Sequence, residues 1–212
     1  MVRRPTLHPE AFVDAALSYV DAHGAAGLTA RVLGEMLDAD PTALYRHFPS
    51  MDALHGAVLN RVFGLILEAP IVGTTPRERL RAHVMNAHRL FYAHPNVLRL
   101  VPSSSGDLTN GDLITVRGLE LIRALGVTGG NLTLCHQMLE SYVLGSHLAD
   151  LGGSPHHLAV RHARRRRLND PDIDASTRTV DDVERLNIAA FEAGLEALLD
   201  RCEAMAKEPS AQ

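Results

Sequence analysis

Cysteine, lysine and uninterrupted apolar sequence are all scarce in this 212-residue chain. The two cysteines, Cys135 and Cys202, fall within apolar helical patterns, so we expect reduced core residues and no disulfide framework. No apolar run approaches the ~20 residues that a membrane span needs, and we expect no membrane partner. The N-terminal MVRRPTLHPEAF lacks the apolar core of a signal peptide. We therefore expect a cytoplasmic protein.

Motifs for catalysis and metal binding are lacking as well. The chain has no Gly-x-Ser-x-Gly, no glycine-rich phosphate loop followed by lysine, and no His-Glu-x-x-His. Among its 12 histidines, His55 forms with Asp52 one isolated pair at the three-residue spacing that a helical metal site prefers. The sequence therefore predicts no enzyme activity, no cofactor and no structural metal.

What the chain does have is helical periodicity, which predicts an all-α fold. A Pro-, Gly- and Thr-containing segment at Pro70–Thr74 is predicted to separate two domains, residues 1–69 and 75–207. Thr75 and Glu78 predict a capping box at the start of the second domain. Outside the motif described next, helices are predicted at 9–22, 51–69, 75–93, 112–125, 131–151 and 180–205. The segments 102–110 and 152–179 are predicted to be a loop and a long polar connection.

The most informative segment is Leu28–Leu54, LTARVLGEMLDADPTALYRHFPSMDAL. Thr29 has the side chain of a helix N-cap. The apolar residues of the first short helix recur at helical spacing: Val32, Leu33, Met36 and Leu37. Asp38-Ala39 is predicted to form a tight turn, because aspartate tolerates the left-handed backbone conformation that often ends a helix.

A second short helix is predicted to begin at Asp40-Pro41, with Asp40 as N-cap and Pro41 in the first turn. Leu44 and Phe48, four residues apart, should face inward, whereas a small and polar cluster faces outward: Thr42, Ala43, Tyr45, Arg46 and His47. An ordinary helical hairpin would share the caps and the apolar faces. It would not require that outward cluster, which suits a helix-turn-helix over residues 29–48.

The segment resembles the DNA-binding domain of the tetracycline-repressor (TetR) family of bacterial transcriptional regulators. The residues that carry the resemblance are Gly27-Leu28-Thr29, Arg31, Leu33, Leu37, Leu44-Tyr45, His47-Phe48 and Leu54. The resemblance implies an N-terminal three-helix DNA-binding domain and a C-terminal helical domain for ligand binding and dimerisation. It also implies a homodimer on a palindromic double-stranded operator, and most simply a repressor that a small molecule releases.

The resemblance assigns roles within the motif. Thr29 would cap the first helix against a phosphate, and Tyr45 and His47 would hold the sugar-phosphate backbone. Base contacts would come from Arg31, Thr42, Ala43 and Arg46. The complete set of predicted DNA-binding residues is Thr29, Arg31, Pro41, Thr42, Ala43, Tyr45, Arg46 and His47.

In the second domain the last two long helices are the predicted dimer surface. Small residues such as Gly145 and Gly194 allow close approach of helices, although packing within one chain would use them equally well. Leu195 and Leu198 lie on the broad apolar face predicted for the last helix, and a charge at either should dissociate the dimer if they face the partner, or unfold the chain. The resemblance implies an effector cavity, for which the candidate lining residues are Met85, His88, Phe91, Leu119, Met138 and Tyr142. Few charges fall on the inferred inward faces, which favours a small, mostly apolar effector.

Charge supports an alternative function. Residues 1–68 contain five arginines against eight acidic residues, a net charge of −3. Phosphate neutralisation supplies much of the affinity for DNA, so a TetR-like module with weak DNA affinity, acting mainly in ligand or protein binding, is the second hypothesis. The most basic run, Arg164–Arg167, lies in the predicted polar connection and is interpreted as solvated charge.

Overall fold

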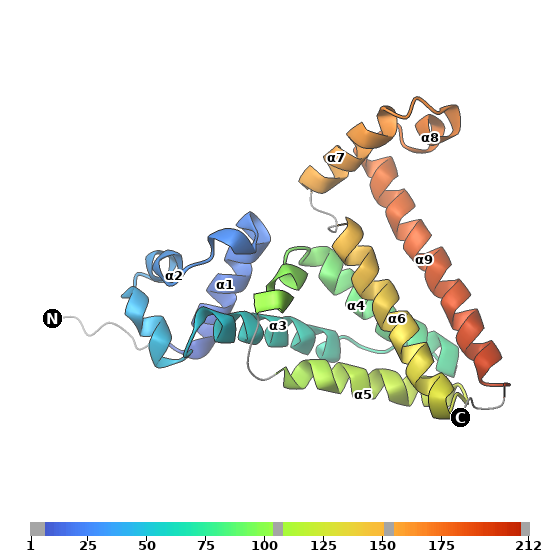
Figure 1. The fold of residues 1–212 in the computed structure, drawn as a ribbon, viewed down its shortest axis with the longest axis horizontal. Helices are drawn as coiled ribbons and strands as arrows, with labels where there is room; N and C mark the ends of the chain where they lie inside the picture. The colour runs from blue at the N-terminus through green and yellow to red at the C-terminus, as the bar shows by residue number, and fades with distance from the viewer. Residues whose placement is uncertain (1–6, 104–107, 151–154, 209–212) are drawn as a thin grey trace. The chain divides into compact units, whose positions relative to one another are not determined.

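The computed structural model describes residues 7–103, 108–150 and 155–208, and every regular element within them is a helix, as the periodicity predicts (Figure 1). Within these ranges no helix combines the length and apolar character needed to cross a membrane. Some predictions fall outside the described residues. These are the first residues of the N-terminus, part of the 102–110 loop, the helix end at Leu151 and the start of the polar connection at 152–154.

The described residues form two compact units. The first comprises Met1–Glu68 and Asn96–Ile114, and the second comprises Ala69–Pro95 and Thr115–Gln212. The chain leaves the first unit near the predicted boundary but later returns to it. The segment Asn96–Ile114, which we placed in the domain 75–207, therefore packs with the first unit, and this corrects the continuous domain ranges.

The first unit contains α1 (Pro9–His23), η1 (Ala25–Gly27), α2 (Ala30–Met36), η2 (Pro41–Arg46), α3 (Met51–Glu68) and η3 (Val97–Ser103). Its core residues share near-complete burial: Phe12, Ala16, Val20, Leu33, Leu44, Leu54, Val58, Val62 and Leu100. Helix α3 packs against both α1 and η3. The predicted α3 face of Leu54, Val58, Val62 and Ile66 is confirmed, since all four are buried.

Asparagine side chains show why the later segment joins this unit. The Asn96 side chain donates to the carbonyl of Val20 at 3.1 Å. Asn110 donates through its backbone N–H to Oδ1 of Asn60 and through Nδ2 to the Asn60 carbonyl, both at 2.8 Å. These bonds join residues 50 or more positions apart, which local sequence patterns do not reveal.

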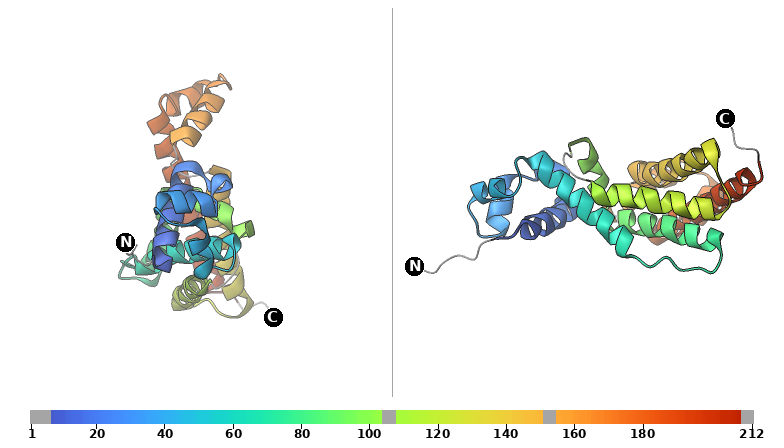
Figure 2. Two further views of the ribbon diagram at one scale, coloured as in Figure 1. Left: turned by 90° about the vertical axis from the view of Figure 1, so that its left-hand side faces the viewer. Right: turned by 90° about the horizontal axis from the view of Figure 1, so that it is seen from below.

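The second unit is built on α4 (Pro76–Ala93), α6 (Gly129–Asp150) and α9 (Val180–Met205), and α6 packs on both of the others (Figures 1 and 2). Helix α5 (Thr109–Ala124) begins in the first unit and ends in the second. The capping box at Thr75 and Glu78 is confirmed. Its backbone hydrogen bonds hold the pKa of Glu78 down at about 2.

An ion-pair network joins α4 to α9. Arg77 Nη2 lies 2.7 Å from Glu196 Oε2, and Arg81 Nε lies 2.6 Å from Glu196 Oε1. Arg77 also reaches Asp200 at 2.8 Å and Glu203 at 2.9 Å. The two guanidinium groups lower the pKa of Glu196, so these contacts favour its charged form and fix the pairing of the two helices.

The predicted polar connection 152–179 contains two helices, α7 (Pro155–Arg166) and α8 (Pro171–Ser176), and this corrects the sequence interpretation. Both pack on α9 (Figure 1). Leu158 is the buried residue of α7. With so little apolar surface to bury, the helix leaves only a weak apolar periodicity in the sequence. Its last-turn arginines, Arg164 to Arg166, suit the negative end of the helix dipole. Arg166 pairs with Asp174 of α8 at 3.0 Å.

Helix α9 has the predicted bounds, and part of its predicted broad apolar face is buried within the chain. Leu195 is fully buried within the chain, so it cannot face a partner subunit. The Tyr142 side chain of the same chain occupies the space beside Gly194, since a Cβ there would collide with the Tyr142 hydroxyl. The Tyr142 hydroxyl donates to the carbonyl of Phe191 at 3.0 Å. Intrachain packing therefore explains both residues.

Candidate functional site

The first motif helix, α2, begins as the sequence predicts. Thr29 has an extended backbone, and its hydroxyl oxygen accepts a hydrogen bond from the Val32 N–H at 3.3 Å. Leu33 is fully buried, whereas Met36, which we listed among the apolar residues at helical spacing, is 46% exposed. Because α2 is only two turns long, the cap and one buried leucine set its position.

The turn after α2 depends on one residue that the sequence analysis missed. Asp38 has the predicted left-handed conformation, with φ of 47°. The Ala39 N–H then donates to the Gly34 carbonyl at 2.9 Å, which folds the turn back onto α2. A Cβ on Gly34 would lie 2.8 Å from the Ala39 carbonyl oxygen and 3.2 Å from the Pro41 ring. Only glycine fits this approach, and the available signal was a glycine inside the short helix, four residues after its start at Ala30.

The second motif helix, η2, has the predicted cap but a tighter winding than an α-helix. One carboxylate oxygen of Asp40 accepts from the Thr42 N–H at 2.8 Å and from the Thr42 hydroxyl at 2.6 Å. These bonds lower the pKa of Asp40. Since its hydroxyl hydrogen is committed to Asp40, Thr42 can offer a DNA base only a hydrogen-bond acceptor.

The two faces of η2 differ as predicted. Leu44 is fully buried and Phe48 is 9% exposed. Thr42, Tyr45, Arg46, His47 and Pro41 are exposed, and Ala43 is half-buried. The His47 ring also packs near Phe12, with ring centroids 5.7 Å apart, which fixes its orientation on the surface. The predicted residues of η2 thus share one surface of the first unit.

On α2 the predicted DNA-binding residue Arg31 is already partnered. Its Nε lies 3.0 Å from Glu35 Oε1, with side chains 83% and 65% exposed. Exposed pairs at this spacing contribute only about 0.3–0.5 kcal/mol. A phosphate or a base can therefore compete for the guanidinium, although Glu35 opposes it.

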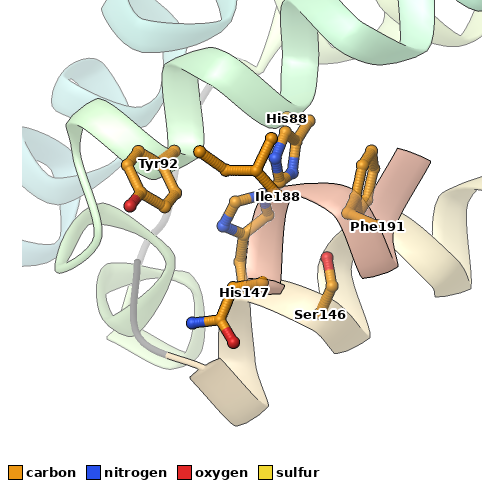
Figure 3. Close-up of a pocket in the computed structure, with 7 residues that line it drawn as sticks. His88, Tyr92, Ser146, His147, Ile188 and Phe191 are labelled. Carbon is orange, nitrogen blue, oxygen red and sulfur yellow. Dashed lines mark hydrogen bonds between the residues drawn. The ribbon is translucent and has the colours of Figure 1, made fainter. Parts of the chain in front are cut away.

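The second unit contains a different candidate site, a pocket of aromatic and histidine side chains (Figure 3). It is lined by two residues of α4, two of α6 and three of α9: His88, Tyr92, Ser146, His147, Asn187, Ile188 and Phe191. The His88 ring stacks on Phe191 with centroids 3.6 Å apart and planes at 11°. Tyr142 also stacks on Phe191, at 4.9 Å and 22°.

Two histidines meet in this pocket. His88 Nδ1 and His147 Nε2 are hydrogen-bonded at 3.0 Å, and both residues are buried. Burial lowers the pKa of each imidazole to about 4, and a second cause for His147 is its neighbour His88. Both rings are therefore neutral at ordinary pH, with one donating and the other accepting.

The predicted effector residues are only partly gathered here. His88 lines the pocket, Tyr142 stacks on its wall, and Phe91 contacts His147 edge-on with centroids 5.7 Å apart. Met85, Leu119 and Met138 do not line this pocket. The sequence analysis missed the other six lining residues. Their four-residue spacings on α4 and α9 were an available signal, but the facing helices could not be paired from one sequence.

Neither cysteine has the surroundings of a reactive thiol. Cys135 and Cys202 are fully buried, and burial raises the pKa of both thiols, that of Cys202 to about 12. Cys135 Sγ instead lies 3.6 Å from the Met205 sulfur. Within the described residues no three His, Cys, Asp or Glu side chains gather in a metal-binding arrangement.

Comparison with known proteins places this geometry in a family, although no family model matches the chain. A curated transcriptional repressor, DrrR1 of Streptomyces coeruleorubidus, is 30% identical over 146 residues, which cover 68% of this chain and 53% of the repressor. The match thus spans about half the length of that curated relative. The structure of SCO7222, a TetR from Streptomyces coelicolor, is 26% identical with a TM-score of 0.72 and covers 94% of this chain and 99% of that one.

A structure of BioQ with its double-stranded DNA operator is also similar, at 26% identity and a TM-score of 0.64, over 93% of this chain and 99% of that chain. The helical fold, the capped motif and these similarities together define a regulator of the helix-turn-helix class. The chain belongs to the TetR family of transcriptional regulators, a family of transcription factors and not of enzymes.

Proposed function

We propose that the chain is a DNA-binding transcriptional repressor that reads its operator with η2. The observation that carries this proposal is the exposed cluster on η2, which two caps and a fully buried Leu44 hold in place. The bound operator of BioQ and the repressor function of DrrR1, as those proteins are described, support it.

Within the motif, Arg31, Thr42, Ala43 and Arg46 contact base edges in the proposal, and Tyr45 and His47 hold the backbone. Tyr45 is 52% exposed, and His47 is fixed by Phe12. Thr42, as an acceptor, suits the amino group of adenine or cytosine in the major groove. Thr29 and Pro41 lie at the starts of α2 and η2 and contact the DNA backbone in the proposal.

The proposed repressor is a homodimer on a palindromic operator, because one short helix reads few base pairs. Helix α9 presents small exposed residues at helical spacing, namely Ala189, Ala193 and Ala197, and Gly145 of α6 faces open space. These small residues remain the expected partner contacts, since Leu195 is buried within the chain. Half-buried Leu198 remains a candidate.

The proposed signal is a small, mostly apolar effector that binds the second unit and releases the DNA. The pocket around His88 and Phe191 supports this role, because none of its lining residues carries a charge at neutral pH.

The second function is a ligand-binding module with weak DNA affinity, which the net charge of −3 over residues 1–68 favours. A gel shift at low salt, with DNA flanking the chain's own gene, separates the two. A repressor should give a discrete complex that competitor DNA of unrelated sequence does not remove. Binding that any DNA displaces equally would favour the second function.

A further inference from the structure

The His88–His147 hydrogen bond lies at the centre of the pocket in the second unit and joins α4 to α6 (Figure 3). Neutral imidazole has one N–H donor and one nitrogen acceptor, and the tautomer decides which atom plays which role. In the pair, one ring therefore offers an N–H and the other a lone pair, 3.0 Å apart. A ligand that separates the rings must satisfy both groups to avoid leaving a buried polar atom unpaired.

A hydroxyl group meets that requirement. Its oxygen accepts from the N–H of one imidazole while its hydrogen is donated to the nitrogen of the other. A carbonyl oxygen only accepts, so it would pair with both rings only if the accepting imidazole changed its tautomer. The histidine pair therefore favours a hydroxyl, which fits both rings without a change of tautomer, over a carbonyl or a purely apolar group.

The wall beside the pair selects a flat ring. His88 lies nearly parallel to Phe191, at 11°, and Tyr142 lies within 22° of the same ring. Aromatic rings favour offset stacking at these separations. A planar ligand that displaces the His88 ring can take its place on Phe191, whereas a puckered ring of the same size cannot.

The lining disfavours a charged ligand. It consists of histidine, tyrosine, serine, asparagine, isoleucine and phenylalanine side chains, with no Asp, Glu, Arg or Lys among the seven. Burial keeps both imidazoles uncharged, with a pKa of about 4. An anion or a cation would lose its hydration here and find no counter-charge among the seven lining side chains.

We propose that this pocket binds a neutral, planar aromatic alcohol, such as a phenol or naphthol, whose ring stacks on Phe191 and whose hydroxyl inserts between His88 and His147. The proposal deepens the ligand-responsive function above and rests on it. It names both the chemical class of the effector and the hydrogen bond that the effector replaces.

The pocket must open for such a ligand. Its cavity volume is about 30 Å³, room for water but not for an aromatic ring. Ile188, 37% exposed, covers one side and can move into solvent. Separating the histidines then loosens the contact of α4 with α6, which is a change that a ligand binding to the opened state alone would favour.

A matched ligand series on the full chain tests the proposal. The chain has no tryptophan, so the fluorescence of β-naphthol reports its binding with little protein background. Three analogues each change one property. Naphthalene lacks the hydroxyl, decahydro-β-naphthol lacks planarity, and β-naphthalenesulfonate is charged. Naphthalene is followed by its own fluorescence and the other two by competition.

β-Naphthol should bind about tenfold more tightly than naphthalene, the ratio that one good hydrogen bond supplies. The saturated and the sulfonated analogues should bind at least about tenfold more weakly than β-naphthol. Equal binding of β-naphthol and naphthalene, preferred binding of the sulfonate, or no saturable binding of β-naphthol would each overturn the proposal.

Variants place the effect in the pocket. His147→Phe keeps a ring but removes the hydrogen bond, so the naphthol-to-naphthalene ratio should fall to about one. His136→Phe, the same change elsewhere on α6, should keep the ratio. His147→Gln, which restores a donor and an acceptor, should recover part of it. A ratio unchanged in His147→Phe contradicts the assignment, and if that variant does not fold, the ligand series on the unaltered chain decides.

Release of DNA is measured separately, by adding β-naphthol to the complex with the operator. Tight, selective binding without release would contradict the ligand-responsive function and leave the pocket assignment intact. Release of DNA without the expected ligand selectivity would support the ligand-responsive function and contradict the pocket assignment.

Discussion

The motif in the first unit and the pocket in the second are built in opposite ways. The motif uses about 20 consecutive residues, and its capping hydrogen bonds join residues two or three positions apart: Thr29 with Val32, and Asp40 with Thr42. The pocket joins residues 59 positions apart through His88 and His147 and reaches Phe191 on a third helix. Surface recognition can thus be specified locally, whereas a buried site needs the whole unit to be folded.

The side chains of the motif and of the pocket also differ in solvent exposure. Arg31, Tyr45 and Arg46 project into solvent, while His88, His147 and Phe191 are buried. Substitutions on the motif surface should therefore change binding with little effect on folding. Substitutions at or beneath the pocket should change stability first. Four experiments test that contrast.

The largest effect should come from a charge beneath the pocket. Leu195 lies one helical turn after Phe191 and is fully buried, so Leu195→Glu should destabilise the second unit by about 4 kcal/mol or more. Thermal unfolding followed by circular dichroism measures this. Ala197→Glu, on the exposed side of α9, is the control and should melt near the wild type while weakening the proposed dimer in sedimentation. If Leu195→Glu melted at the same temperature as the wild type, substitutions at the pocket would not reduce stability more than those on the motif surface.

Acid should weaken the pocket next. Its two histidines have a pKa of about 4 in the folded chain, against about 6.5 when unfolded. The unfolded state therefore binds more protons as pH falls from about 6.5 to about 4, and the free energy of unfolding decreases across that window, by about 2–3 kcal/mol for each histidine. Urea unfolding at several pH values measures the slope.

His147→Phe should flatten that dependence, because it removes one of the two groups, and His136→Phe should not. An equally steep dependence in both variants would assign the acid sensitivity to other residues.

The same contrast explains what the sequence could predict. Caps, the left-handed Asp38 and the inward Leu44 follow from local rules, and the structure confirms each of them. Gly34 was missed because its role appears only when the turn folds back. Helix α7 was missed because its arginines obscure a short apolar face. The segment 96–114 was assigned to the wrong domain because its contacts with Asn60 and Val20 join residues that are distant in sequence. Of the pocket, only His88 was predicted, since pairing α4 with α6 and α9 requires the tertiary fold.

On the motif, side chains should separate into readers and anchors. Arg46→Ala should lose preference at one defined base pair, at a cost of about 1–3 kcal/mol if the contact is bidentate to guanine. Tyr45→Phe should weaken binding about equally on all operator variants, because a phosphate contact carries no sequence information. Binding measured across an operator series distinguishes the two, and circular dichroism should show both variants folded. A uniform loss for Arg46→Ala would remove it from the base-reading set.

The smallest effect should come from Glu35, which pairs with Arg31 on the exposed side of α2. Glu35→Gln removes the competitor for that guanidinium and changes the net charge of residues 1–68 from −3 to about −2. Stability should change by less than about 0.5 kcal/mol, since the pair is solvated, while DNA affinity at low salt should rise a few-fold. Glu10→Gln makes the same charge change on α1, away from Arg31, and isolates the general electrostatic part. A gain in Glu35→Gln beyond that of Glu10→Gln would identify Arg31 as a DNA contact. Equal gains would reduce its role to overall charge, and a large loss of stability in Glu35→Gln would end the distinction between a tolerant motif surface and a sensitive pocket.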